Sequence, residues 1–149
     1  MLLSKINMAD STILALDIGE KRIGVARANS IALIAEPLIT LTNNDEFFDK
    51  LSDLIDEHKV SLLIIGSPRN LNDNPTEQTR YTHDFAKKIA ETTKVPILFQ
   101  NEALSSVVAK DRLARDNRKH DKSEVDSTAA AVILETFIES NMDRIKQLA

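Results

Sequence analysis

The sequence predicts a mixed α/β domain with a central β-sheet flanked by α-helices. Two observations predict this fold class: an opening pair of apolar segments of strand length, followed by an alternation of amphipathic helical segments and further apolar strands. A chain of 149 residues has the length of one domain and can bury roughly two-thirds of its unfolded surface. We therefore expect a single domain over residues 1–149, with residues 1–11 as a flexible N-terminal extension.

The first part of the chain predicts a β-hairpin followed by a third strand. Thr12–Ile18 is apolar and ends at Gly19, and Arg22–Ala28 resumes after a short turn. Ile31–Leu41, interrupted by Pro37, has the composition of another strand. The sheet therefore begins with three consecutive strands.

The middle of the chain alternates helix and strand. Asp45–His58 carries apolar residues at helical spacing and predicts an amphipathic helix. Val60–Gly66 is a continuous apolar run, as expected for a parallel strand that is covered on both faces, and it should be central. A second helix is expected to run to about Thr93, with Asn74 as its N-cap and Glu77 as the capping-box partner.

The last third of the chain is mainly helical. Val95–Gln100 predicts a strand, and Asn101–Arg115 looks helical after its first residues. A basic loop follows, and Ser123–Ser140 predicts a final helix rich in alanine. Helices are therefore expected to complete the cover of the sheet.

Composition excludes several classes of site. The chain has no cysteine, so it has no disulfide, no thiolate metal site and no cysteine nucleophile. Its longest apolar runs, such as Ile13–Leu16 and Leu62–Ile65, are too short to span a membrane, and Met1–Asp10 lacks the apolar core of a signal peptide. We expect a cytoplasmic protein with no membrane partner.

The charge distribution suggests one local site for a polyanion. The net charge is −4, so no overall attraction to nucleic acid is expected. One stretch is nevertheless basic, and we expect it to contact a nucleic-acid backbone, although charge runs are also typical of solvated surface. The cations of this stretch are Lys110, Arg112, Arg115, Arg118, Lys119 and Lys122, with His120 beside them.

Asp17 is the first of three acidic residues that could carry chemistry. Period-two counting places it on the same strand face as Ile13 and Ala15, where an unpaired carboxylate is costly to bury. The alternative is an aspartate that caps the turn at Gly19. The position alone leaves both interpretations open.

Glu102 and Asp126 are the other two acidic candidates. Glu102 follows the strand Val95–Gln100, at the sheet edge where α/β proteins bind ligands, but it could also be a solvated glutamate in a first helical turn. Asp126 ends the stretch Ser123–Asp126, which fits a helix-capping signature. Together with Asp17, these residues form an oxygen-only ligand set that suits Mg²⁺ or Mn²⁺. Such ions can activate water and stabilise a leaving oxygen in phosphodiester hydrolysis.

The remaining functional side chains give weaker signals. His58 and His83 are expected at the surface, because neither has a partner at metal-ligand spacing. A single tyrosine, no tryptophan and phenylalanines at helical spacings do not predict a base-stacking platform. Recognition of backbone and shape is the expectation.

Several motifs are similar to those of one known family. Leu16–Ala26 (LDIGEKRIGVA) resembles the opening strand and hairpin of the YqgF/RuvX family almost position by position. Ile65–Pro68 with Asn70 looks like the family's strand-end loop, and Val125–Ala130 matches the start of its last helix. The likeness spans about Ile13–Glu139, nearly the whole chain.

The resemblance implies a ribonuclease H-like fold and a nuclease that trims the 5′ end of precursor 16S rRNA. It implies that Asp17, Glu102 and Asp126 are catalytic carboxylates that hold Mg²⁺ or Mn²⁺. It also places Lys21 and Arg22 near the substrate backbone. The implied partners are precursor rRNA, branched DNA and ribosomal particles, with the protein as a monomer or a homodimer.

One departure from the family and three alternative functions remain. Where the family usually reads Asp-Glu-Arg, this chain has Asn101, Glu102 and Ala103, and loss of groups that orient a metal ligand commonly costs about 10- to 100-fold in affinity or activity. The chain could be a catalytically weak ribosome-assembly binding protein, or a Holliday junction resolvase, which would need a dimer. Asp17–Gly19 also looks like a phosphate motif of the actin and sugar-kinase ATPases, but those proteins have two lobes.

Overall fold

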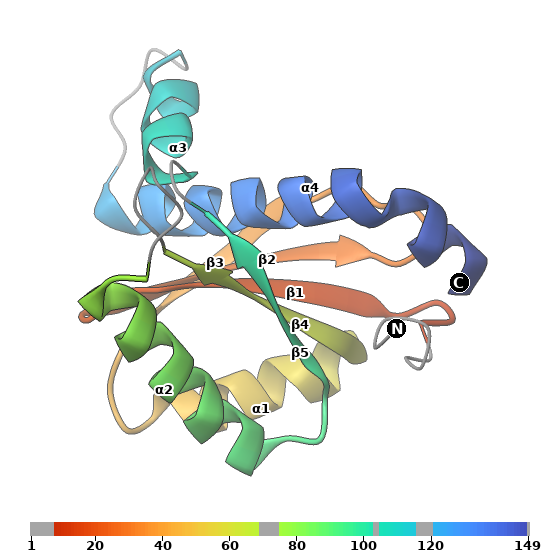
Figure 1. Cartoon of the computed structure of the whole chain (residues 1–149), viewed down its shortest axis with the longest axis horizontal. Coiled ribbons are helices and arrows are strands. Elements are labelled where there is room, and N and C mark those ends of the chain that lie inside the picture. Colours follow the sequence, from red (N-terminus) through yellow and green to blue (C-terminus); the bar gives the residue numbers. More distant parts are fainter. Residues whose placement is uncertain (1–7, 69–74, 103–104, 116–120, 149) are drawn as a thin grey trace.

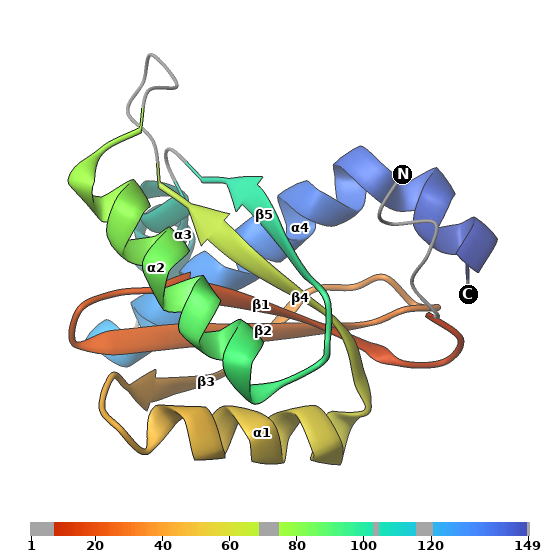
Figure 2. The same cartoon turned by 60° about the horizontal axis from the view of Figure 1, so that its bottom comes forward.

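The computed structural model describes residues 8–68, 75–102, 105–115 and 121–148. It contains a five-stranded sheet in the order β3-β2-β1-β4-β5, with helix α4 across one face and helices α1 and α2 on the other (Figures 1 and 2). This architecture confirms the predicted mixed sheet flanked by helices. The elements are β1 (Thr12–Ile18), β2 (Arg22–Asn29), β3 (Glu36–Thr42), α1 (Phe47–His58), β4 (Val60–Ser67), α2 (Glu77–Thr92), β5 (Ile97–Asn101), α3 (Ser105–Ala114) and α4 (Lys122–Leu148).

The predicted hairpin is confirmed, and the sheet is mixed. β1 and β2 are antiparallel, with a register that runs from the pair Thr12 and Asn29 to the pair Ile18 and Ile23. β1 is parallel to β4, which is parallel to β5. The apolar strand β4 is therefore internal, as its composition predicts, but the middle strand of the sheet is β1.

The third strand is shorter than predicted, because a turn occupies its first residues. The side-chain oxygen of Asn29 accepts hydrogen bonds from the backbone N–H groups of Ile31 (2.8 Å) and Ala32 (3.1 Å). Leu33 has φ of 56°, in the left-handed region, which no strand residue adopts. β3 consequently begins at Glu36.

Two helix starts also differ from the sequence prediction. α1 begins at Phe47 instead of Asp45, because the Asn44 side chain accepts the Glu46 N–H (3.0 Å) and forms a turn there. The predicted cap of α2 is wrong, because Thr76 is its N-cap. Asn74 lies outside the described residues.

Thr76 and Thr79 form the capping box of α2. The Thr76 backbone N–H donates to Thr79 Oγ1 (2.9 Å), and the Thr79 N–H donates to Thr76 Oγ1 (3.3 Å). A threonine pair thus satisfies the N–H groups for which Glu77 was expected to provide the partner. The helix itself and its buried stripe of Phe85 and Ile89 are as predicted.

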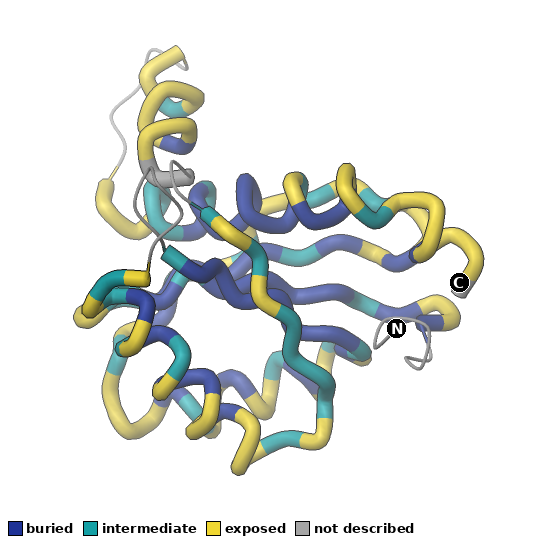
Figure 3. Tube along the Cα trace, viewed as in Figure 1, coloured by how far each residue is buried: buried dark blue, intermediate teal, exposed yellow. Residues whose placement is uncertain are grey.

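Two apolar clusters hold the layers together, one on each face of the sheet. Alternate residues of β1 pack against α4 or against α1 and α2, as a period of two requires. α4 extends beyond the predicted end at Ser140, and Ile145 in the added part is fully buried. Figure 3 shows the inner strands β1, β2 and β4 mostly buried, β5 only partly buried and α3 largely exposed.

Residues near both ends of the described chain, Met8 and Ile145, pack in the same apolar cluster. Within the N-terminal segment expected to be a flexible extension, Met8 is fully buried, and residues 1–7 lie outside the described part.

None of the helices in the described ranges combines the length and apolarity that crossing a bilayer requires.

Candidate active site

Asp17 lies on the central strand, on the face that α4 covers. It is paired with Gly24 of β2, and the parallel register that pairs Leu16 with Ile65 brings it beside Gly66 of β4. Its own face is the one that Ile13 and Ala15 present to the α4 cluster. The period-two placement made from the sequence is therefore confirmed.

The glycines on either side of Asp17 leave room for the other two acidic residues. A Cβ atom at Gly24 would lie 2.0 Å from the backbone oxygen of Asp126, so α4 can approach the sheet this closely only over a glycine. A Cβ atom at Gly66 would lie 2.9 Å from Cδ of Glu102. Asp126 and Glu102 thus flank Asp17 from two sides.

Both neighbouring carboxyl groups act electrostatically on Asp17. Burial raises the pKa of Asp17 to about 8, and the negative charges of Glu102 and then Asp126 contribute to the same shift. The fold therefore brings three residues that are far apart in the sequence to neighbouring positions around Asp17. In the metal-free protein at neutral pH, Asp17 is mostly protonated.

The structure also decides against the alternative interpretations of these residues. The turn after β1 is closed by backbone, since the Gly19 N–H donates to the Arg22 carbonyl (3.0 Å), so it needs no cap from Asp17. The start of α4 is capped by Asp121, whose Oδ1 accepts the Glu124 N–H (3.0 Å). Asp126 is therefore not the capping residue that its spacing from Ser123 suggested.

Glu102 is held at the end of β5 and does not lie in the first turn of α3. Its N–H donates to the Ser67 carbonyl (3.3 Å), which continues the pairing of β5 with β4. Its side chain is partly buried over Gly66. The prediction that Asn101–Arg115 is helical after its first residues is confirmed, because Asn101 is the last residue of β5 and α3 runs over Ser105–Ala114.

Asp126 forms an ion pair with Arg22 of the hairpin. Nε of Arg22 donates to Oδ2 of Asp126 at 2.6 Å, and the two side chains are 38% and 22% exposed. A cavity of about 270 Å³ opens beside this pair, and Lys110, Lys122 and Val125 line it as well. Cationic side chains thus adjoin the acidic site directly.

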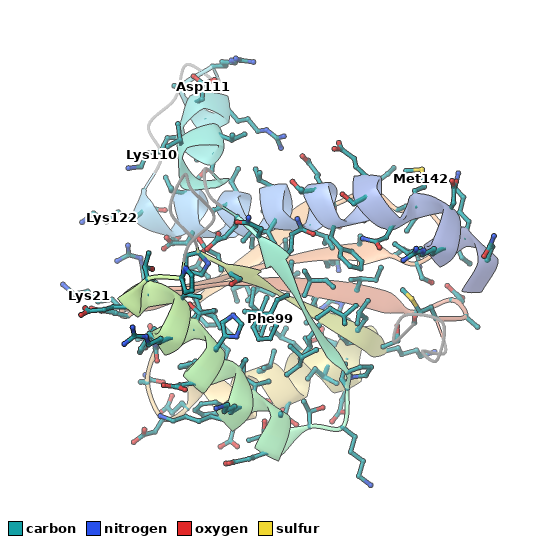
Figure 4. The ribbon with its side chains drawn as sticks, in the orientation of Figure 1. Lys21, Phe99, Lys110, Asp111, Lys122 and Met142 are labelled. Carbon is teal, nitrogen blue, oxygen red and sulfur yellow. The ribbon has the colours of Figure 1, made fainter. Side chains whose placement is uncertain are left out.

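The other predicted cations differ in their surroundings. Figure 4 shows Lys21, Lys110 and Lys122 at the end of the molecule where α4 begins, whereas Met142 lies toward the opposite end. Arg112 donates two hydrogen bonds to the Glu135 carboxylate (2.9 and 2.7 Å), and Arg115 pairs with Asp111 (3.1 Å). Outside the described residues lie Arg118, Lys119 and His120.

One pair of side chains near the site was missed by the sequence analysis. The rings of His83 and Phe99 stack with their centroids 4.0 Å apart, and His83 Nε2 lies 3.1 Å from Ser67 Oγ. His83 is therefore part of a contact between α2 and the sheet, and Phe99 is an exposed aromatic ring on β5. Phe99 follows Ile97 at a spacing of two, on the same face of β5, and this spacing was the signal available in the sequence.

The donor set suits a hard divalent cation. All three groups offer carboxylate oxygens, which Mg²⁺ and Mn²⁺ prefer, and a cation between them would relieve the repulsion that raises the pKa of Asp17. In the described part of the chain, no three acidic or histidine side chains already surround one point closely enough to hold an ion. The residues fit the cation in type and charge. One of them, Asp126, is engaged by Arg22 in this structure.

The five-stranded sheet flanked by helices is a ribonuclease H-like fold. Among solved structures, Thermus thermophilus RuvC is similar with a TM-score of 0.53 and 9% identity, covering 89% of this chain and 96% of that one. The same protein in complex with a Holliday junction substrate gives a TM-score of 0.56 and 11% identity, with the same coverage. This likeness shows a shared fold.

The sequence comparisons establish the family. Residues 11–140 match the model of the RuvX family, described as "Holliday junction resolvase", and the chain belongs to this family. A relative from Sulfurihydrogenibium sp. is 37% identical over 131 residues, which is 87% of this chain and 90% of that one. One from Dechloromonas aromatica is 36% identical, covering 87% and 91%. Both carry the name "Putative pre-16S rRNA nuclease".

Proposed function

We propose that the protein is a metal-dependent endonuclease that hydrolyses phosphodiester bonds at the 5′ end of precursor 16S rRNA during ribosome biogenesis. The observation that carries the proposal is the placement of Glu102 and Asp126 on either side of Asp17. The names of the relatives from Sulfurihydrogenibium and Dechloromonas support the choice of RNA. On this proposal the protein works in the cytoplasm, in contact with ribosomal particles.

Each acidic residue has a separate structural support. Asp17 lies on the middle strand, Glu102 is tied to β4 at the end of β5, and Asp126 projects from the long helix α4. Rigid elements of this kind hold ligands more accurately than loops do. These three residues would hold Mg²⁺ or Mn²⁺, which when bound supplies activation of water and stabilisation of negative charge on the phosphate.

The basic residues next to the site position the nucleic acid. Arg22, Lys110 and Lys122 surround the cavity beside Asp126, so phosphates of a bound strand would lie against them. Such contacts hold the backbone in register without reading the bases. Lys21, exposed in the hairpin turn, extends the same basic end.

Cleavage of branched DNA is the second candidate function. The shared fold with RuvC and the description of the family favour it. A resolvase must cut two strands symmetrically, so this function requires a homodimer. A monomer would suit the trimming of a single RNA end. The oligomeric state during cleavage therefore distinguishes the two candidates.

The test is cleavage of an end-labelled precursor 16S rRNA fragment, with a four-way DNA junction in parallel, in Mg²⁺ and in Mn²⁺. The wild type is compared with Asp17→Asn and with Asp53→Asn, a control that removes an exposed carboxylate from α1 on the opposite face of the sheet. We expect the wild type and the control to cut the RNA, and Asp17→Asn to be inactive.

Other outcomes revise the proposal in defined ways. Full activity of Asp17→Asn overturns the assignment of the site. Cleavage of the junction alone selects the resolvase. If the folded wild type cuts neither substrate, Asn101 beside Glu102 points to a ribosome-assembly binding protein, and retention on ribosomal particles becomes the measurement that counts.

A further inference from the structure

The Arg22–Asp126 ion pair joins the start of β2 to the first turns of α4. The two residues are 104 positions apart, and the bond between Nε and Oδ2 is only 2.6 Å long. Bonds between charged partners of this length are about twice as strong as neutral ones. The bond also uses an oxygen of the carboxylate that the cation would need.

The pair is placed where two charged ligands would meet. On one side, Asp126 lies beside Asp17, and Glu102 lies on the far side of Asp17; these acidic residues attract a cation. On the other side, Arg22 faces the cavity that Lys110 and Lys122 line, which attracts a phosphate. While this bond holds, Oδ2 of Asp126 is withheld from a cation and Nε of Arg22 is withheld from a phosphate.

We infer that Arg22 competes with the divalent cation for Asp126 and transfers to a substrate phosphate when the cation binds. Cation binding and phosphate binding then strengthen each other, because the ligand that arrives first breaks the ion pair and the second finds its partner already released. Arg22 is thus a positioning residue that limits occupation of the metal site in the absence of substrate. This inference rests on the proposed function, since it takes Asp126 as a cation ligand.

The test is a calorimetric titration of Mn²⁺ into the metal-free protein, with no nucleic acid present. We expect Arg22→Gln to bind Mn²⁺ about tenfold more tightly than the wild type, the factor that corresponds to loss of one charged hydrogen bond. The same variant should cut RNA more weakly through a higher KM, because it lacks a phosphate contact. If Arg22 served only to hold the fold together, Arg22→Gln would lower the Mn²⁺ affinity together with the activity, and this result would overturn the inference.

Removal of any positive charge near the acidic site also strengthens the binding of a cation there, so a matched control is needed. Lys110→Gln removes one charge from the same cavity, and Lys110 is not paired with Asp126 in the described structure. We expect this variant to tighten Mn²⁺ binding much less than Arg22→Gln. Equal effects of the two substitutions would overturn the competition and leave only a general charge effect.

A measurement on the wild type removes the dependence on any variant. During a Mg²⁺ titration followed by NMR, the Nε–H signal of Arg22 should shift as its bond to Asp126 breaks. A stationary Arg22 signal, while backbone amides near Asp126 respond, refutes the inference and leaves the proposed function intact. Absence of Mn²⁺ binding by the wild type even with RNA present refutes the proposed metal dependence instead.

Discussion

Asp17 and Gly24 face each other across β1 and β2, and the glycine brings the backbone of α4 close to the aspartate. The backbone oxygen of Asp126 occupies the space that a side chain at Gly24 would need. One missing side chain on β2 therefore positions an acidic residue of α4 next to an acidic residue of β1. The acidic site is a consequence of how closely the helix packs on the sheet.

Substitution of Gly24 by alanine should destabilise the fold. The new Cβ atom would lie 2.0 Å from a backbone oxygen, which cannot rotate away, so α4 must shift. Overpacking of this kind costs about 1–3 kcal/mol, and we expect Gly24→Ala to lose at least that much unfolding free energy in a urea titration. An unchanged urea midpoint would show that α4 does not depend on this close approach.

The matching substitution at Gly66 should affect the site more than the fold. Here a Cβ atom would meet side chains, Ile133 Cδ1 at 2.6 Å and Glu102 Cδ at 2.9 Å, which can move. We expect Gly66→Ala to lose less stability than Gly24→Ala but to weaken Mn²⁺ binding about tenfold, because Glu102 is displaced. Calorimetry and urea unfolding of both variants check this. A larger stability loss at Gly66 would contradict it.

The raised pKa of Asp17 predicts a pH-dependent effect of its removal. Because the pKa of Asp17 is about 8 in the folded metal-free protein and near 3.8 without the fold, the folded state binds the extra proton between these values. Wild-type stability is therefore lost as pH rises through this window. In Asp17→Asn this loss is absent. The unfolding free energy of the variant, relative to that of the wild type, should therefore rise by more than about 1.4 kcal/mol between pH 5 and pH 9.

Thermal unfolding in EDTA at several pH values measures this difference. Asp53→Asn, which lies on the exposed side of α1, serves as the control and should follow the wild type at every pH. A difference between Asp17→Asn and the wild type that stays constant from pH 5 to pH 9 would contradict the prediction.

Arg112 should contribute to stability and Lys110 to RNA binding, although both are cations of α3. Arg112 forms a two-bond ion pair with Glu135 of α4, whereas Lys110 faces the cavity beside Asp126. We expect Lys110→Gln to make the logarithm of the RNA-binding constant fall less steeply with the logarithm of salt concentration, by about the amount that one phosphate contact contributes. Arg112→Gln should instead reduce stability by about 0.5–1 kcal/mol, the value of a well-formed surface pair.

Filter-binding titrations at several salt concentrations give the first quantity. A double-mutant cycle with Glu135→Gln gives the second, since it isolates the interaction between the two side chains. A change of salt dependence in Arg112→Gln as large as that in Lys110→Gln would show that Arg112 leaves Glu135 to contact RNA.

Much of the fold and the acidic site could be predicted from the sequence, because those signals are local. Strand length and the period of two placed Asp17 on the face of Ile13 and Ala15, and the end of an apolar strand pointed to Glu102. The turn of Asn29 and the threonine cap of α2 were local too, but competing polar residues nearby concealed them.

What the tertiary structure alone decided concerns residues far apart in the chain. That Asp126 pairs with Arg22, 104 positions away in the sequence, depends on where the helix crosses the hairpin. The same crossing explains why Gly24 must be a glycine, and which cations of α3 remain beside the site. Periodicity and capping depend on a few neighbouring residues, so the sequence by itself determined the elements and the faces of their acidic residues. The partners of those residues depend on strand register and helix packing, which only the folded chain determines.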